Sequence, residues 1–473
     1  GAVLDAVDTA LTGLRLKTEA CQGWINCIKY CPTQAIRVHN GKAHIIDKFC
    51  IDCGRCIRYC PHHAKIPIYD SLNVLNLYKY TVALPAPSLY AQYNNLTNVD
   101  IVLNALLKLG FDDVFEVSAA AELVSEASRE YMKAHTEEGP FISSACPSVV
   151  RLIRVKFPAL LPKLLPIKPP VEVAAEIARA RAVAKTGLSP EDIGVIFISP
   201  CPSKVSYVKA PLGIEKSSID NVVAIKDVYP LLLPHMTRDE SQLESLSMSG
   251  RIGLGWGSSG GEVGGLLIDN YLAADGIVNI MRVLEGIEDE KIHGLKFIEL
   301  NACNGGCVGG TLNVENGYVA TAKSKRLQRY QPVAKSHLSS HPEVKDIRWD
   351  DKIAYEPVFR LGNTFKESLE MMSTVEELTK KFPGLDCGSC GAPTCQTLAE
   401  DIVRGDATSN DCIYVLREHI ASLSKEIDFL SKASGRSCSF EDESTKLLHE
   451  YIHKLTTELD AFGVPQGNNE KGK

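Results

Sequence analysis

The chain lacks several features that would place it in common functional classes. No apolar run reaches the roughly 20 residues that span a bilayer, so we expect no membrane segment. Lysine and arginine total 51 against 58 acidic residues, and no basic block stands out, which argues against nucleic acid as a partner. The first residues, GAVLDAVDTALTG, lack the basic start and apolar stretch of a signal peptide. We therefore expect a cytoplasmic protein.

Cysteine, by contrast, is abundant, with 16 in 473 residues. In a reducing compartment clustered cysteines are metal ligands rather than disulfide partners. Seven lie within residues 21–60, four stand singly between 146 and 307, and four lie within 387–412. Only Cys438 stands apart, and we expect no ligand role for it.

Apolar strand-like and helix-like runs alternate over residues 80–345, which predicts parallel sheets with helices on their faces. The expected strands are TVALPAP, DDVFEV, GPFISS, IGVIFISP and GLKFIEL. VDIVLNALLKLG and EVAAEIARARAVAKTG predict helices that end at Gly110 and Gly187. A polar stretch from about 320 to 355 shows no clear periodicity and predicts a lobe edge or linker. The fold class is α/β and multi-domain, with a two-lobed parallel α/β domain at 78–350.

Two similar cysteine runs, CQGWINCIKYCP and CIDCGRCIRYCP, begin at Cys21 and Cys50. The second run matches the C-x2-C-x2-C-x3-C-P pattern of bacterial two-cluster ferredoxins, in which the fourth cysteine serves the other cluster. Residues 15–75 are thus expected to form a two-cluster ferredoxin-like α+β domain. The crossed pairing predicts one complete [4Fe–4S] cluster on four cysteines: Cys31, Cys50, Cys53 and Cys56.

The first run is incomplete, because Trp24 occupies its second ligand position and an indole offers no lone pair to iron. The remaining site has three thiolates: Cys21, Cys27 and Cys60. These fit a [3Fe–4S] cluster, or a [4Fe–4S] cluster with one open or non-cysteine iron, and the alternative is a degraded site without a cluster. His62 and His63 are expected to be solvated surface residues.

The four scattered cysteines each follow a run that predicts a strand. They are Cys146, Cys201, Cys303 and Cys307. The carboxyl ends of parallel strands meet at one edge of a sheet, where α/β proteins build their sites, and four thiolates gathered there suit an iron–sulfur cluster. The glycine-rich segment NGGCVGG at 304–310 lets the backbone approach a bulky cofactor. The alternative is four buried free thiols.

Three segments, SSACPSVVRL, SPCPSKV and FIELNACNGGCVGG, resemble the signature motifs of [FeFe]-hydrogenases, and LPAPSLY resembles a loop that precedes the first motif. The resemblance covers roughly residues 15–345. It implies an H-cluster, in which a [4Fe–4S] cubane on the four scattered cysteines is joined through Cys307 to a di-iron subcluster with CO, cyanide and azadithiolate ligands. It also implies that Lys204 and Ser88, with Pro87 beside it, serve the cyanides, since buried anions need donors. H2 and protons are the implied substrates.

Several positions depart from that family. Efficient members carry a cysteine before the first cubane cysteine as a proton relay, and here that residue is Ala145. Glu126 matches one relay glutamate, but Arg129 and Leu165 stand where the second carboxylate and the relay serine are expected. Two methionines beside the di-iron site are replaced: Ser199 and Asn301. A positioned proton-transfer group contributes roughly 10²–10⁴-fold in rate. The pattern resembles the sensory-type [FeFe]-hydrogenases and implies slow, reversible H2 oxidation and proton reduction that serves H2 or redox sensing.

The last cysteine group has spacings of two, four and sixteen residues. Its members are Cys387, Cys390, Cys395 and Cys412. Two close pairs fit zinc, but the run resembles a four-cysteine [4Fe–4S] domain of electron-transport and corrinoid proteins, which favours iron–sulfur. We expect a small helical cluster domain at 366–425 that passes electrons to a redox or signalling protein. A helical tail with a disordered end follows at 426–473, and it packs on its own domain or supports a homodimer.

A different functional class stays open. A hydrogenase-like iron–sulfur assembly or scaffold protein would keep the cubane cysteines and the ferredoxin repeats without a di-iron site. Lys204 and Ser88 favour the enzyme, because cyanide ligands explain them best, whereas Ala145, Ser199 and Asn301 weaken that preference. A plain electron carrier would leave the NACNGGC loop unexplained.

Overall fold

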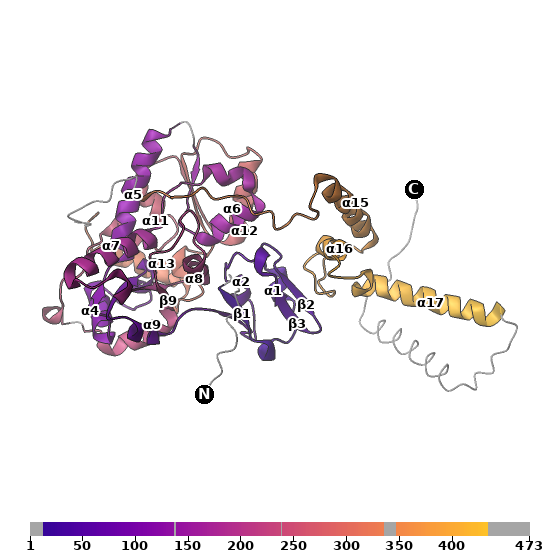
Figure 1. Cartoon of the computed structure of the whole chain (residues 1–473), viewed down its shortest axis with the longest axis horizontal. Helices are drawn as coiled ribbons and strands as arrows, with labels where there is room; N and C mark the ends of the chain where they lie inside the picture. The colour runs from indigo at the N-terminus through magenta and orange to yellow at the C-terminus, as the bar shows by residue number, and fades with distance from the viewer. Residues whose placement is uncertain (1–12, 137–138, 238, 335–346, 434–473) are drawn as a thin grey trace. The chain divides into compact units, whose positions relative to one another are not determined.

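The computed structural model describes residues 13–136, 139–237, 239–334 and 347–433. The chain divides into two compact units, one formed by residues 1–35 and 41–359 and the other by residues 36–40 and 360–473 (Figure 1). The segments expected at 15–75 and 78–350 therefore share most of one unit. No helix in the described ranges is long and apolar enough to cross a membrane.

The larger sheet of the first unit is parallel throughout, with the strand order β6-β5-β8-β9. Its strands are β5 (Tyr80–Pro85), β6 (Asp113–Val114), β8 (Ile193–Ser199) and β9 (Asn221–Ala224). β5 and β8 pair in register from Tyr80 with Ile193 to Pro85 with Ile198. Every residue of β8 is buried, as expected of a parallel strand covered on both faces.

A second parallel sheet forms the other lobe, in the order β10-β11-β7. Its strands are β7 (Phe141–Ile142), β10 (Tyr271–Asp275) and β11 (Phe297–Asn301). All five apolar runs expected to be strands fall on β5, β6, β7, β8 and β11. The fold is therefore mixed α/β with parallel sheets, as the alternation of runs predicted.

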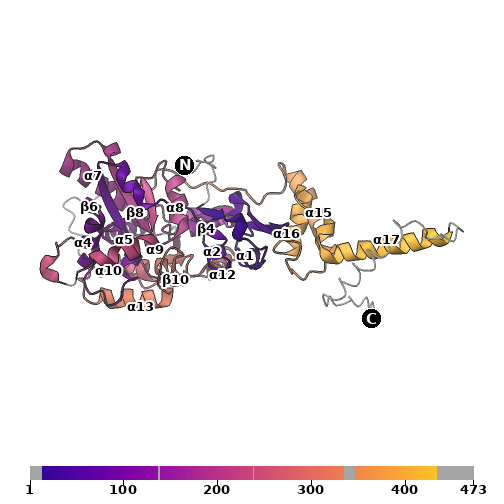
Figure 2. The same cartoon turned by 90° about the horizontal axis from the view of Figure 1, so that it is seen from below.

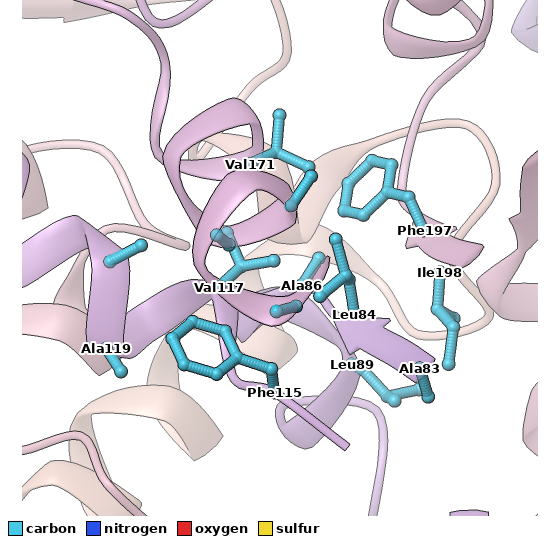
Figure 3. Close-up of a cluster of buried hydrophobic side chains, with 14 of the residues drawn as sticks. Ala83, Leu84, Ala86, Leu89, Phe115, Val117, Ala119, Val171, Phe197 and Ile198 are labelled. Carbon is cyan, nitrogen blue, oxygen red and sulfur yellow. The ribbon is translucent and has the colours of Figure 1, made fainter. Parts of the chain in front are cut away.

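The helices of this unit enclose both sheets. They are α3 (Pro87–Tyr90), α4 (Asp100–Leu109), α5 (Val117–Ala134), α6 (Pro147–Lys156), α7 (Pro170–Thr186), α8 (Pro202–Lys209), α9 (Ile225–Leu232), α10 (Arg251–Gly255), α11 (Gly261–Leu266), α12 (Ile277–Glu288) and α13 (Gly317–Gln328). α7 packs against β5, β8 and α5. Figure 3 shows the resulting core, in which Leu84 and Phe197 of the sheet gather with Val117 of α5 and Val171 of α7.

Helix ends follow the glycines of the sequence. α4 and α7 stop directly before Gly110 and Gly187, and both glycines have positive φ. The expectation of an irregular stretch from about 320 is wrong at its start, because α13 continues to Gln328. Ala320, Ser324 and Leu327 form a buried stripe at helical spacing, and that stripe is too short and too polar to stand out in the sequence.

The cysteine-rich N-terminal segment combines short strands with two single-turn helices. β1 (Leu14–Leu16) pairs antiparallel with β4 (Lys65–Pro67), and β2 (Ile36–His39) and β3 (Lys42–Ile45) are the other strands. α1 (Asn26–Lys29) and α2 (Arg55–Arg58) carry Cys27 and Cys56. The two copies of the repeat therefore adopt the same local structure.

The second unit is helical where it is described after residue 360. It contains α15 (Phe365–Lys381), α16 (Cys395–Arg404) and α17 (Ile413–Ala433) (Figure 2). α15 opens with a capping box between Thr364 and Glu367. α17 is continuous across the boundary expected at 425, so cluster domain and tail share one helix. The remaining tail, with Cys438 and the end expected to be disordered, lies outside the described residues.

Candidate functional site

Each of the four scattered cysteines follows the carboxyl end of a parallel strand. Cys146 comes after β7 and is the N-cap of α6, and Cys201 comes after β8 and is the N-cap of α8. Cys303 and Cys307 follow β11. Both helices have proline in their first turn, and helix N-termini favour negative charge. The topology delivers all four thiols to strand ends.

The four sulfurs lie within electrostatic reach of one another. Burial raises the pKa of Cys201 to about 11, and Cys307 and Cys146 add to this effect while Lys204 opposes it. Burial, followed by the other three thiols, holds the pKa of Cys303 well above its ordinary 9.0. Thiols kept neutral in this way become ligands when a cation compensates their charges. An iron–sulfur core supplies that charge, so the donor set fits one.

The loop between Cys303 and Cys307 needs its glycines for its own packing. Gly306 has a φ of +89°, and a Cβ there would lie 2.5 Å from the backbone nitrogen of Ser259. A Cβ on Gly309 would lie 2.0 Å from the Asn304 carbonyl oxygen. The glycine-rich segment is thus required for a tight fold of this loop, whether or not a cofactor approaches it.

A cavity of about 60 Å³ opens beside Cys307. Its polar lining consists of Ser88, Lys204, Glu262, Glu299, Asn301 and Cys307, and its apolar lining includes Pro87, Ala145, Phe197 and Trp256. Lys204 Nζ lies 3.9 Å from the Cys307 sulfur. The buried Ser88 hydroxyl has no hydrogen-bond partner among the described residues. An ammonium and an orphan hydroxyl facing one small cavity suit an anionic guest.

The charge of Lys204 is set by its surroundings. Burial disfavours its ammonium form, but Cys307, Cys201 and Cys146 together outweigh that cost and raise its pKa above the ordinary value. Lys204 therefore stays protonated and offers a permanent donor at the cavity wall.

Two glutamates reach the cavity that the sequence pattern did not point to. Glu262, at the start of α11, accepts a 2.6 Å hydrogen bond from the Ser143 hydroxyl. Glu299, in the middle of β11, accepts from the backbone of Gly260 at 2.8 Å and Val263 at 3.0 Å. Asn301 Nδ2 also donates to Glu299, at 2.7 Å. The one signal available was a charged residue inside the apolar strand FIELN.

The two glutamates form a coupled acid pair. Burial raises the pKa of Glu262 to about 8, and the charge of Glu299 adds to the shift. Burial also raises the pKa of Glu299, although the hydrogen bonds that it accepts oppose this. Glu262 therefore holds a proton near neutral pH, next to the Ala145 segment, where the Ala145 amide donates to Ser143 Oγ at 3.2 Å.

Other expected site residues are placed differently. Glu126 is exposed on α5 and does not line the cavity. Arg129 donates to the Gly265 carbonyl oxygen at 2.5 Å. Ser199 is buried outside the lining, where its hydroxyl donates to the Cys201 carbonyl at 3.0 Å. Pro87, Ala145 and Asn301 do line the cavity, so the structure gathers most of the expected set but not Glu126 or Ser199.

The crossed cysteine set of the N-terminal segment also comes together. Burial raises the pKa of Cys53 to about 12, and its nearest charged neighbour is Cys31. Cys50 and Cys56 both interact with Cys31 after burial has raised their pKa values. Cys53 also lines a pocket that contains Cys303, and Arg58 Nη2 donates to the Gly309 carbonyl at 2.5 Å there. The N-terminal cysteines thus adjoin the scattered set.

At the incomplete site the two histidines differ. His63 is exposed, as expected, but the expectation of a solvated His62 is wrong. The His62 ring packs edge-on against Trp24 with 5.0 Å between ring centroids, and its Nε2 atom is buried. The contact depends on the fold, because the two residues lie in different copies of the repeat.

The last four cysteines line one small pocket in the second unit. They are Cys387, Cys390, Cys395 and Cys412. Burial raises the pKa of Cys390, and Cys387 and Cys412 add to the shift. The Cys395 amide donates to Asp386 Oδ1 at 2.7 Å, which fixes the start of α16 beside the pocket. No three His, Cys, Asp or Glu side chains within the described ranges lie close enough to hold a single metal ion.

Known families match the chain in three places. Residues 79–267 and 235–311 match the family described as iron only hydrogenase large subunit, C-terminal domain. Residues 14–61 match a 4Fe-4S dicluster domain. Residues 382–414 match a family described by an Fe-S cluster. Iron–sulfur domains therefore account for all three cysteine groups.

Curated relatives and solved structures agree with these matches. Iron hydrogenase 1 of Clostridium pasteurianum is 25% identical over 49% of this chain and 50% of its own length. The NADP-reducing hydrogenase subunit HndD of Solidesulfovibrio fructosivorans is 24% identical over 62% of each chain. The chain thus spans half to three fifths of these relatives. A solved [FeFe]-hydrogenase HydA1 variant from Chlamydomonas reinhardtii is 19% identical, covering 56% of this chain and 88% of its own, with a TM-score of 0.43. By its sequence matches, the chain belongs to the iron-only hydrogenase family and carries a 4Fe–4S dicluster domain ahead of the hydrogenase domain.

Proposed function

We propose that the chain is a slow, sensory-type [FeFe]-hydrogenase that binds H2 at an H-cluster and reports H2 or redox state. One observation carries the proposal: Ser88, Lys204 and Cys307 meet in one cavity, and Ala145 lines the same cavity. The first three residues suit a cofactor with anionic ligands. The fourth removes the thiol through which efficient relatives are expected to move protons.

The residues present fit an H-cluster. The cubane would be held by Cys146, Cys201, Cys303 and Cys307, whose thiols need a compensating cation. When bound, the group supplies the iron that takes H2 and an amine that takes a proton. Lys204 and the Ser88 hydroxyl, which lacks a partner in the described part of the chain, would donate to its anionic ligands.

Proton movement from the cavity would depend on acids that replace the usual relay. The Ala145 methyl group has no exchangeable proton, and Glu126 is exposed away from the cavity. Glu262 is the cavity group that holds a proton near neutral pH, with Ser143 hydrogen-bonded to it and Glu299 beside it. A pKa of about 8 makes Glu262 able to accept and release a proton, but it is a carboxyl without a thiol partner at position 145.

Electrons would pass between the N-terminal clusters and the cubane where Cys53 and Cys303 share a pocket. The four-cysteine pocket of the second unit would hold a further cluster, which we propose exchanges electrons with a redox or signalling protein.

The test is maturation of the protein with a synthetic di-iron complex, followed by infrared spectroscopy. We expect CO and cyanide bands, together with H2 turnover roughly 10²–10⁴-fold below that of a bidirectional relative such as iron hydrogenase 1 of Clostridium pasteurianum. Turnover equal to that relative would contradict the sensory role. A protein that retains its cubane iron but shows no bands would favour the iron–sulfur scaffold.

A further inference from the structure

The incomplete N-terminal site keeps the backbone contacts of the complete one. The Ala64 amide donates to the Cys60 sulfur at 3.3 Å, as the Ala35 amide donates to the Cys31 sulfur at 3.2 Å. The Ala43 amide donates to Cys21 in the same way, at 3.3 Å. Such bonds to sulfur are part of what tunes an iron–sulfur cluster. Their survival argues that Cys21, Cys27 and Cys60 still bind a cluster.

The corner that lacks a cysteine is bordered by His62. Trp24 occupies the ligand position in the sequence, but its side chain is 55% exposed, so the indole does not fill the space among the sulfurs. The indole instead meets His62 edge-on, with 5.0 Å between ring centroids. His62 follows the ligand Cys60 by two residues. The chain therefore places an imidazole between a retained ligand and the residue at the vacated position.

The Nε2 atom of His62 is buried and has no hydrogen-bond partner among the described residues. Buried polar atoms are nearly always satisfied, so an orphan of this kind calls for a partner outside the protein. Imidazole nitrogen replaces cysteine at iron in some iron–sulfur centres. We propose that His62 is the fourth ligand of a [4Fe–4S] cluster whose other ligands are Cys21, Cys27 and Cys60.

Lys65 gives this cluster a second distinguishing feature. Its side chain is 2% exposed, and Nζ lies 3.0 Å from the Cys27 sulfur. Its charge also acts on Cys21 and Cys60. The equivalent residue of the other repeat copy is Ile36, which follows Ala35 as Lys65 follows Ala64.

Two differences in charge therefore act in the same direction. A neutral imidazole in place of a thiolate removes one negative charge, and the Lys65 ammonium adds a positive one. Reduction adds an electron, and a less negative site accepts it more readily, so this cluster has a higher reduction potential than the all-cysteine cluster on Cys31. Of the two N-terminal clusters it is the one reduced first.

Pulsed EPR of the full-length, cluster-loaded protein carrying ¹⁵N-histidine tests the ligand directly. We expect the reduced protein to show the hyperfine coupling of an iron-bound nitrogen, which is lost in His62→Ala and kept in His63→Ala. His63 is the matched control, because it is the adjacent residue and is exposed. His62→Ala should also lose about one iron and gain, when oxidised, the signal of a [3Fe–4S] cluster. The labelling result on the unmodified protein stands even if a variant fails to fold.

Three results would overturn the assignment: no nitrogen coupling in the unmodified protein, a [3Fe–4S] signal already present in it, or identical spectra for the two histidine variants. A redox titration followed by EPR tests the role of Lys65. Lys65→Ile should lower the potential of this cluster, Lys65→Arg should restore it, and the Cys31 cluster serves as the internal reference. An unchanged potential in Lys65→Ile, or an equal shift of both clusters, would contradict the charge argument.

Discussion

The Ser143 hydroxyl donates a 2.6 Å hydrogen bond to Glu262 Oε2 and accepts one from the Ala145 amide at 3.2 Å. A carboxyl is thereby fixed beside the residue whose side chain cannot carry a proton. Because burial raises the pKa of Glu262 to about 8, this carboxyl can exchange a proton under physiological conditions. The cavity has lost a thiol relay and gained an acid.

Glu262→Gln tests whether that acid serves turnover. The amide keeps the size of the side chain and can still accept from Ser143, but it cannot release a proton at neutral pH. We expect H2 turnover of the matured protein to fall by roughly 10²-fold, with CO and cyanide bands unchanged. Glu126→Gln is the matched control, because Glu126 is exposed outside the cavity, and it should leave turnover unchanged. The reverse pattern would place the proton route along the relay that the family resemblance implied.

Glu262 also predicts how stability changes with pH. Its pKa rises on folding from the ordinary 4.5 to about 8, because of burial and then the charge of Glu299. Between these values the folded protein binds more protons than the unfolded chain, so the free energy of unfolding falls as pH rises through the window. Glu262→Gln cannot ionise and should lose less of its unfolding temperature than the parent between about pH 6 and pH 8.5. Equal pH slopes for both proteins would show that Glu262 does not bind the extra proton.

Lys204 predicts the retention of an anionic cofactor. Lys204→Met removes the donor at the cavity wall, and a charge-assisted hydrogen bond contributes about 1.5–3 kcal/mol. We therefore expect at least tenfold weaker CO and cyanide bands after maturation, measured against cubane iron that stays unchanged. Lys209→Met lies on the same helix at an exposed position and should retain full bands. If both variants mature like the parent, the cavity does not hold an anionic ligand through Lys204.

Local patterns account for most of what could be predicted about the fold. The five apolar runs became strands, because each is long enough or apolar enough to be recognised alone. β10 escaped recognition, since Tyr271–Asp275 is largely half-exposed and has no continuous apolar run. β9 has only four residues, which is too few for a periodicity to show. The helix ends at Gly110 and Gly187 were predictable because the cap is a local requirement for positive φ.

The site divides along the same line. The cysteine ligands, Ser88 and Lys204 lie in short motifs whose spacing is visible in the chain. Glu262 stands among glycines in GGEVGG, 37 residues before Glu299, and only the packing of α11 against β11 brings the two carboxyls together. His62 is a similar case, since its burial depends on a contact with Trp24 from the other repeat copy.

Ala145→Cys gives the sharpest test of why turnover is slow. The variant restores a thiol in the cavity, but a relay needs every member in hydrogen-bond reach of the next. Glu126 is exposed outside the lining, and Arg129 is bonded to the Gly265 carbonyl, so neither can receive the proton. We expect turnover to rise less than tenfold above that of the parent. A rise of 10²-fold or more would show that position 145 alone limits proton transfer, and that Glu262 already completes the route to solvent.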